Sequence, residues 1–258
     1  MEFWQYILLI GGGFIAGCIN TLAGYGSIIC LSILMDVVGL PANVANGSNR
    51  LNVLSTGVIG SYIFYKNGKL NFSKGKTYIG ITFIGAIIGI YAATVISNEA
   101  FRGVFRYMVV ILFILLLVKP KRWLKEKSED YRLPLWISLP VFLSIGFYGG
   151  FIQMGVGLFI LAALVLGSKY NLIDANALKI FITTFYTILA TMIFWWKGLI
   201  EWESGLLLAA GSTVGGWITS TYASTYPNAH LWAYRLLVAM ITFIILYQFK
   251  VLSWFLDF

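Results

Sequence analysis

Long apolar runs follow one another along almost the whole chain. Examples are YIGITFIGAIIGIYAATVI (78–96), YMVVILFILLLV (107–118) and LLVAMITFIILY (236–247). About 20 apolar residues in a helix cross the hydrocarbon core of a bilayer, where the backbone has to satisfy its own hydrogen bonds. Only 11% of the 258 residues are charged, whereas a soluble domain carries roughly 25%. The runs therefore predict an all-α polytopic membrane protein without a sizeable soluble domain.

The basic residues and the N-terminus fit the same class of protein. The net charge is +8, but most Lys and Arg residues stand in short loops beside apolar segments. That distribution is typical of the positive-inside rule, so no nucleic-acid partner is predicted. The first residues, MEFWQYILLIGGG, carry an acidic residue and no clear cleavage site for a signal peptidase. We therefore expect a retained first helix rather than a signal peptide.

Five apolar segments precede the most polar loop, KPKRWLKEKSEDYR (119–132), and five follow it. We expect residues 1–118 to form a first transmembrane repeat, 119–133 a cytoplasmic linker and 134–258 a second transmembrane repeat. The ten segments are 4–22, 27–40, 42–65, 77–97, 103–118, 134–152, 158–167, 174–196, 204–224 and 231–250.

Identical residues recur at one constant spacing in the two parts. The matched pairs are Ala45 and Asn46 with Ala175 and Asn176, Gly68 with Gly198, Gly75 with Gly205, Gly85 with Gly215, and Asn98 with Asn228. At slightly different spacings, Gly13 and Gly17 match Gly146 and Gly150, and Gly24 and Gly26 match Gly155 and Gly157. A duplicated unit with small insertions predicts this pattern.

Loop charges predict that the second copy is inverted. The loop 66–76 holds four lysines, whereas its counterpart, KGLIEWES (197–204), holds one lysine and two glutamates. Under the positive-inside rule these loops lie on opposite sides of the membrane. With the loop 66–76 and the linker in the cytoplasm, both termini face outward. Inverted repeats are typical of secondary transporters.

Two segments are too short to span a bilayer. As helices, 27–40 and 158–167 would reach about 21 Å and about 15 Å, against a hydrocarbon core of about 30 Å. Each follows a Gly-x-Gly stretch, GYG (24–26) or GVG (155–157). We predict broken or re-entrant helices around a midplane site, because a helix N-terminus inside the membrane favours an anion. The alternative is that these glycines only allow close packing.

The stretch TLAGYGS (21–27) also resembles the potassium-channel filter sequence TVGYG. The second copy, QMGVGLF (153–159), has neither the threonine nor the tyrosine. A filter of that type also needs four equivalent loops around one axis. An ion filter is therefore not favoured.

The third and eighth segments begin with polar stretches, ANVANGSNRLN (42–52) and IDANALKIFITT (173–184). Because an ionisable residue deep in a bilayer costs on the order of 3 kcal/mol or more, their cations, Arg50 and Lys179, are candidates for anion binding. The alternative is that both reach an interface with long side chains. The predicted substrate-binding residues are Asn20, Thr21, Gly24, Gly26, Asn46, Ser48, Asn49, Arg50, Gln153, Gly155, Gly157, Asn176, Lys179 and Thr183.

Two other ionisable residues are weaker candidates for a functional site. Asp36, near the end of the second segment, is either a proton or cation site or an interfacial residue. His230, the single histidine, stands in a short turn, for which a surface role is the better interpretation. No metal or other cofactor is predicted.

The two halves resemble a known family in their glycine-rich openings, GFIAGCINTLAGYGS (13–27) and GFYGGFIQMGVGL (146–158), each followed by a polar stretch, ANGSN (45–49) or ANALK (175–179). With these motifs, the chain resembles the sulfite exporter TauE/SafE family, also called the toluenesulfonate uptake permeases. The resemblance implies secondary transport of sulfur-containing oxyanions, such as sulfite or organosulfonates, across the bacterial inner membrane. Members usually carry a glycine triplet at each break, where this chain has Tyr25 and Leu158.

The sequence leaves more than one function open. A secondary transporter for a small sulfur-containing oxyanion, working by alternating access around a midplane site, is the leading hypothesis. The alternatives are transport of another small solute and, less favoured, a membrane-embedded enzyme, which needs clusters of His, Asp or Glu. The expected partners are the small anion, membrane lipid and, as an open possibility, a second copy in a homodimer.

Overall fold

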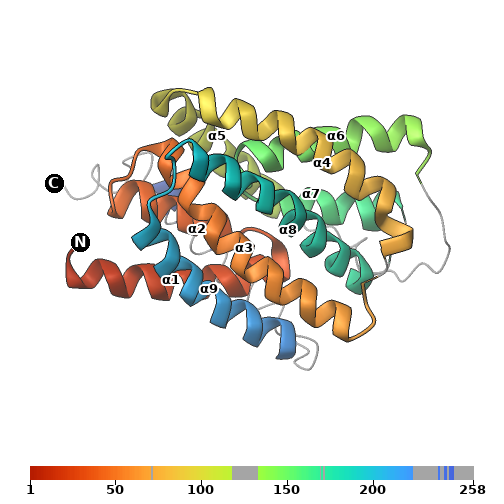
Figure 1. Cartoon of the computed structure of the whole chain (residues 1–258), viewed down its shortest axis with the longest axis horizontal. Helices are drawn as coiled ribbons and strands as arrows, with labels where there is room; N and C mark the ends of the chain where they lie inside the picture. Colours follow the sequence, from red (N-terminus) through yellow and green to blue (C-terminus); the bar gives the residue numbers. More distant parts are fainter. Residues whose placement is uncertain are drawn as a thin grey trace.

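The computed structural model describes residues 1–70, 72–117, 133–168, 170, 172–222, 238, 241–242 and 244–246. In these ranges the regular structure is helical, without strands, which confirms the all-α prediction (Figure 1). The elements are α1 (Phe3–Ala23), α2 (Gly26–Ser32), η1 (Ile33–Val37), α3 (Ala42–Lys66), α4 (Phe72–Val95), α5 (Asn98–Leu117), α6 (Leu135–Phe151), α7 (Val156–Ala162), η3 (Ala163–Gly167), α8 (Leu172–Trp196) and α9 (Trp202–Tyr222). The predicted linker, the segment 231–250 for the most part, and His230 lie outside the described residues.

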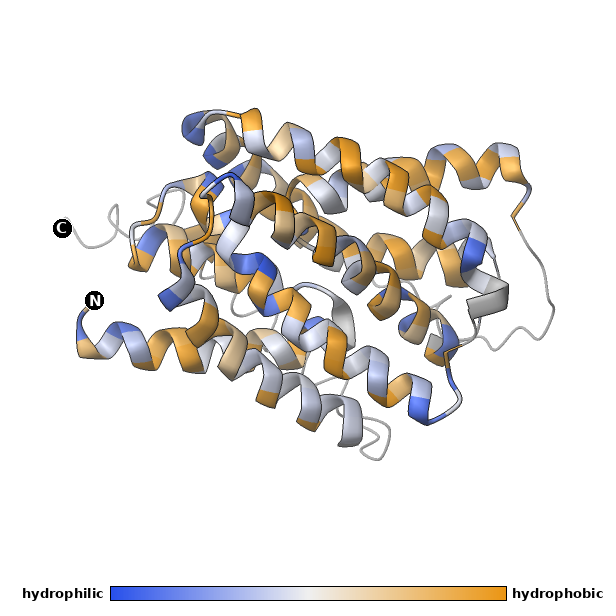
Figure 2. Ribbon diagram, viewed as in Figure 1, coloured by the Kyte–Doolittle hydropathy of each residue, from blue (hydrophilic) through white to orange (hydrophobic). Residues whose placement is uncertain are grey.

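The surface of the described part is more apolar than that of a soluble protein. Three described stretches, Phe3–Thr21, Gly75–Val95 and Ile173–Trp196, are long and apolar enough to cross a membrane. Large apolar side chains cover the outside, such as Phe3, Trp136 and Trp196, which are 80%, 77% and 85% exposed. Figure 2 shows apolar residues along the lengths of the helices. The chain is therefore a multi-pass membrane protein.

Two helix pairs cross the boundary between the two halves of the sequence. α1 packs along α9, and α4 packs along α6. Glycines bring the backbones together in both pairs, because a Cβ at Gly17 would collide with the carbonyl of Ser212, and one at Gly146 with the carbonyl of Thr82. Small residues at close crossings are the usual basis of helix packing in membranes. The first helix of each half thus packs on the fourth helix of the other half.

The glycine contacts give a register for these two pairs. Gly85 of α4 meets the backbone of α6 at Leu143 and Phe147, and Gly215 of α9 meets α1 at Phe14 and Cys18. With Gly85 and Gly215 matched, Gly146 corresponds to Gly17. The sequence comparison matched Gly146 with Gly13, one helical turn away. That pairing was wrong for this register, because glycines recur every four residues on both helices.

The longest helices, α3 and α8, have 25 residues each and pack against one another. Both end in the same turn, with Gly68 at φ 66° and Gly198 at φ 67°. The N–H of Lys69 donates to the carbonyl of Phe64 at 2.9 Å, and the N–H of Leu199 donates to that of Phe194 at 2.8 Å. In Figure 1 the loops that follow α3 and α8 lie at opposite ends of the molecule.

The short segments have the same construction in both halves. Seven α-helical residues of α2 continue into the five π-helical residues of η1, and α7 continues into η3 in the same numbers. Such a segment reaches at most about 18 Å, less than the hydrocarbon core of about 30 Å. The prediction of two undersized segments is confirmed. α7 begins at Val156, two residues before the predicted start of the segment at 158, because Val156 and Gly157 are also helical.

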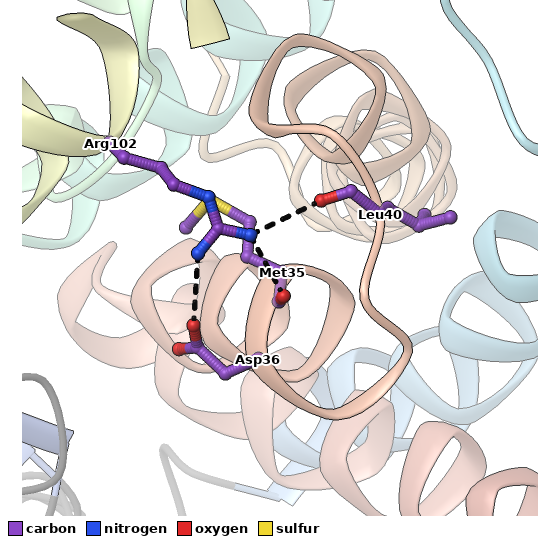
Figure 3. Close-up of polar contacts among 4 residues, drawn as sticks. All are labelled: Met35, Asp36, Leu40 and Arg102. Atoms are coloured by element: carbon purple, nitrogen blue, oxygen red, sulfur yellow. Dashed lines mark hydrogen bonds and ion pairs between the residues drawn. The ribbon is translucent and has the colours of Figure 1, made fainter. Parts of the chain in front are cut away.

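A surface ion pair holds the end of the first short segment (Figure 3). Arg102 of α5 donates to the carbonyl oxygens of Met35 at 3.0 Å and Leu40 at 3.5 Å, and its Nη1 lies 3.5 Å from Asp36 Oδ1. The Arg102 side chain is 42% exposed. A cation at the C-terminal end of a helix is stabilised by the helix dipole. These contacts favour the interfacial interpretation of Asp36 over a proton or cation site.

Candidate functional site

The two helix breaks meet in the middle of the molecule. α1 ends before Gly24, at φ 78°, and α6 ends before Gln153 and Gly155, at φ 58° and 67°. A Cβ at Gly24 would lie 2.6 Å from the Cα of Gly157, and a Cβ at Gly157 would lie 2.8 Å from the Cα of Gly24. Real Cβ atoms do not approach that closely. Glycine on both sides is therefore what allows the two breaks to touch.

A small cavity lies beside this contact. It is lined by Asn20, Thr21, Gly24, Val53, Thr56, Gly57, Gln153, Val156, Gly157, Lys179, Ile180 and Thr183. The cavity thus combines both breaks with one face of α3 and one face of α8. Of the predicted site residues, it brings together Asn20, Thr21, Gly24, Gln153, Gly157, Lys179 and Thr183.

The sequence interpretation missed the remaining lining residues. Thr56 and Gly57 could have been found, because they follow the polar side of α3 at helical spacing from Asn49 and Val53. Val53, Val156 and Ile180 are ordinary apolar residues of a membrane helix and gave no signal.

The other predicted residues line no part of this cavity. Ser48 accepts a hydrogen bond from the N–H of Glu201 at 2.8 Å, at the start of α9, and Asn49 accepts one from Asn52 at 3.1 Å. Gly26 packs on the backbone of Ala16, and Gly155 packs on Leu112. The side-chain oxygen of Asn176 is buried without a partner. These positions support the helices around the breaks.

Arg50 of α3 is completely buried against the end of α6. Its guanidinium donates to the carbonyl oxygens of Gly149 at 3.0 Å, Gly150 at 2.7 Å and Phe151 at 3.4 Å. It also donates to the side-chain oxygens of Gln153 at 2.8 Å and Asn46 at 3.3 Å. The carbonyl oxygens at a helix C-terminus lack partners in the helix, and the helix dipole favours a cation there. Arg50 therefore caps the broken helix α6.

Lys179 of α8 occupies the corresponding place at the end of α1. It is only 2% exposed, and its Nζ donates to the carbonyl oxygens of Thr21 at 3.3 Å and Asn20 at 3.5 Å. Each broken helix thus receives a cation from the third helix of the other half. Lys179, unlike Arg50, lines the cavity and forms only two long contacts.

The polar groups around Lys179 are ordered by neighbouring helices. Gln153 accepts from Arg50 and donates to the hydroxyl of Thr187 at 2.5 Å, so its side chain is held at both ends. The hydroxyls of Thr21, Thr56 and Thr183 donate to carbonyl oxygens of their own helices. Because those protons are in use, the N–H donors among the cavity-lining side chains are those of the Lys179 cation and of the Asn20 and Gln153 amides, and Lys179 alone of these carries a charge.

The charge around the cavity is unbalanced. In the described ranges, neither Arg50 nor Lys179 has a carboxylate within ion-pair distance. A buried charge without a partner is costly, and this cost is relieved when an ion of opposite charge enters. No cluster of three metal-ligating residues is present in the described part either. The arrangement suits the binding of a small anion.

The model of the sulfite exporter TauE/SafE family matches residues 9–248 of the chain. The chain belongs to the TauE/SafE family. Among its relatives, a probable membrane transporter protein of Sinorhizobium sp, ORF9, is 24% identical over 86% of this chain and 85% of its own length. The probable membrane transporter protein YfcA of Escherichia coli K12 is 26% identical over 78% of this chain and 74% of its own. No solved structure matches the chain.

The TauE/SafE match spans both helix breaks and both capping cations. The alignments with these two relatives also cover most of this chain. The names of these relatives point to transport rather than to catalysis.

Proposed function

We propose that this TauE/SafE protein is a secondary transporter for a small sulfur-containing oxyanion, such as sulfite or an organosulfonate, in the bacterial inner membrane. The substrate binds in the cavity between the two helix breaks and pairs with Lys179. The observation that carries the proposal is a buried ammonium that lines a cavity and has no carboxylate among the described residues to neutralise it. The family description, sulfite exporter, agrees with this chemistry.

Alternating access follows from the arrangement of the halves. We propose that they are inverted repeats, because corresponding helices end in the same turns and point in opposite directions (Figure 1). The two helix breaks touch each other at Gly24 and Gly157 in the cavity wall. A change in the packing of one half against the other would open the cavity to one side and then to the other.

Counterflow in proteoliposomes tests the substrate class. Vesicles loaded with sulfite, thiosulfate, sulfoacetate, taurine or methanesulfonate are diluted into the same radiolabelled compound, and accumulation of label is measured. We expect label to accumulate for at least one of the anions, and Lys179→Met to abolish it because the cavity then lacks its cation. The exposed Lys197→Met is the matched control and should behave as wild type. Transport of only neutral or cationic solutes would contradict the proposal.

Cysteine labelling tests the inverted repeats. Asn67 and Lys197 are exposed and stand at equivalent places after α3 and α8. In intact cells, we expect a membrane-impermeant maleimide to label Lys197→Cys, whereas Asn67→Cys reacts only after the membrane is permeabilised. The wild-type protein, with its own Cys18 and Cys30, supplies the background. Labelling of both positions from the same side would refute the inversion.

A second function has less support. A transporter for another small solute would use the same breaks, but the cation of Lys179 would then face a neutral or positive group. Such a solute leaves the buried charge uncompensated. The counterflow panel separates the two, because taurine carries both charges and the other compounds carry only negative charge.

A further inference from the structure

The two buried cations differ in how firmly their charge is held. Arg50 donates to five acceptors and does not line the cavity. A guanidinium also keeps its proton under all physiological conditions. Its charge is therefore a fixed part of the structure.

Lys179 is held much less firmly. An ammonium has three N–H donors, and the protein accepts from Lys179 only at 3.3 Å and 3.5 Å, through two backbone oxygens. Without an anion, a charged Lys179 would be buried at 2% exposure with no counter-ion from the part of the chain that the structure describes. Lysine can lose its proton when it is buried, in contrast to arginine. The empty cavity thus favours the neutral amine, and the occupied cavity favours the ammonium.

Few other groups could take the proton. In the described part of the cavity wall, Lys179 is the ionisable residue, and the remaining lining residues are Asn, Gln, Thr, Gly, Val and Ile. Tyr148 donates its hydroxyl to the carbonyl of Met154, and Tyr78 accepts from Ser168. Tyr186 lies two turns along α8, and Asp174 stands in the first turn of that helix. The other ionisable residues on described elements packed near Lys179 are Glu2, Tyr6, Cys18, Tyr25, Cys30, Asp36, Arg50, Tyr62, Tyr65, Lys66, Lys76 and Tyr91.

We propose that Lys179 is the coupling group of the transporter and carries one proton across the membrane with each anion. This inference rests on the anion transport proposed above. On the entry side the neutral amine takes a proton from water as the anion binds, which gives an ammonium–anion pair. On the exit side the anion leaves and the proton returns to water. For a monovalent anion, the loaded cavity and the empty cavity then carry the same net charge.

A proton gradient across proteoliposomes tests the coupling. The membrane potential is clamped at zero with potassium and valinomycin, and the probe is methanesulfonate, which keeps its single negative charge at every pH used. With the outside more acidic by about one pH unit, we expect about tenfold accumulation inside at equilibrium, because one proton crosses with each anion. A pH-sensitive dye should show the external medium becoming alkaline when methanesulfonate is added.

Substitutions at Lys179 test whether this residue carries the coupled proton. Lys179→Arg keeps a permanent cation that cannot release its proton, so we expect accumulation driven by the proton gradient to disappear at any level of methanesulfonate counterflow that the variant retains. Lys179→His, whose side chain titrates near neutral pH, should retain coupling only in a more acidic range. Lys197→Arg, outside the cavity, is the matched control and should leave both activities unchanged.

The possible outcomes separate this inference from the proposed function. Wild-type counterflow without proton-driven accumulation would overturn the coupling and leave anion transport standing. Proton-driven accumulation that persists in Lys179→Arg would assign the proton to another group and also overturn the inference. Absence of counterflow for every anion of the panel would instead overturn the proposed function. If Lys179→Arg does not fold, Lys179→His provides the test. The inference predicts that its proton-driven accumulation occurs in a more acidic pH range than that of the wild type, and the same pH range in both proteins would contradict it.

Discussion

Replacement of Arg50 with methionine is expected to destabilise the protein by about 3 kcal/mol or more, because the buried carbonyl oxygens of Gly149 and Gly150 would lose their side-chain donor. The side-chain oxygens of Asn46 and Gln153 would lose the same donor, although their amide groups still donate to Phe151 and Thr187. Methionine fills a similar volume, so the loss reflects hydrogen bonds and charge rather than a cavity. Thermal unfolding of the purified protein in detergent, followed by its tryptophan fluorescence, measures the effect.

The control for Arg50 is a cation of comparable length in an exposed position. Lys197 stands on the surface after α8, with its Nζ 6.0 Å from the centre of the Trp196 ring. Lys197→Met should change the free energy of unfolding by less than about 0.5 kcal/mol. An Arg50→Met protein that unfolds at the wild-type temperature but no longer binds anion would contradict the capping role. It would indicate that Arg50 contacts the substrate directly.

Gly157→Ala is expected to reduce transport at least tenfold with a smaller loss of stability, about 1–3 kcal/mol. The new Cβ would lie 2.8 Å from the Cα of Gly24 and 3.1 Å from the Cδ of Lys179. The two helix breaks would have to separate, and Lys179 would have to move, which alters the cavity at its centre. Initial rates of anion counterflow in proteoliposomes give the effect on transport.

Gly103→Ala is the matched control for this substitution. Gly103 is helical in α5, and a Cβ there would meet nothing within 4 Å. Alanine in a helix interior is more favourable than glycine by roughly 0.5–1 kcal/mol, so this variant should be at least as stable as wild type and fully active. Equal transport by Gly157→Ala and Gly103→Ala would show that the close contact of the breaks has no part in the transport cycle.

Much of the fold could be predicted from the sequence because membrane helices leave two strong signals. Apolar length indicates where helices span, and glycines at close crossings recur in both halves. The repetition of these glycines also led to the incorrect match of Gly13 with Gly146. On α1 and α6 they repeat after one helical turn, so a shift of one turn preserves the pattern. The contacts of Gly17 with Ser212 and of Gly146 with Thr82, like those of Gly85 and Gly215, select the register.

The candidate site was only partly accessible to sequence analysis. The breaks at Gly24 and Gly157 could be predicted, since positive φ and close approach both call for glycine. The different roles of Arg50 and Lys179 could not. Arg50 aligns with Ile180 rather than with Lys179, and one residue corresponds to about 100° around a helix. Which neighbour a side chain meets at that angle depends on how α3 packs, and this was not visible in the residue pattern.

The packing of α1 on α9 has a consequence for how the protein is made. Synthesis delivers α1 first, whereas the face that covers its glycines begins only at Trp202. At about 5–20 residues per second, α1 stays in the membrane for roughly 10–40 s before its partner is synthesised. Until α8 is synthesised, the carbonyl oxygens of Asn20 and Thr21 also lack Lys179. We therefore expect the insertion machinery or lipid to shelter the first helix until α9 has been synthesised.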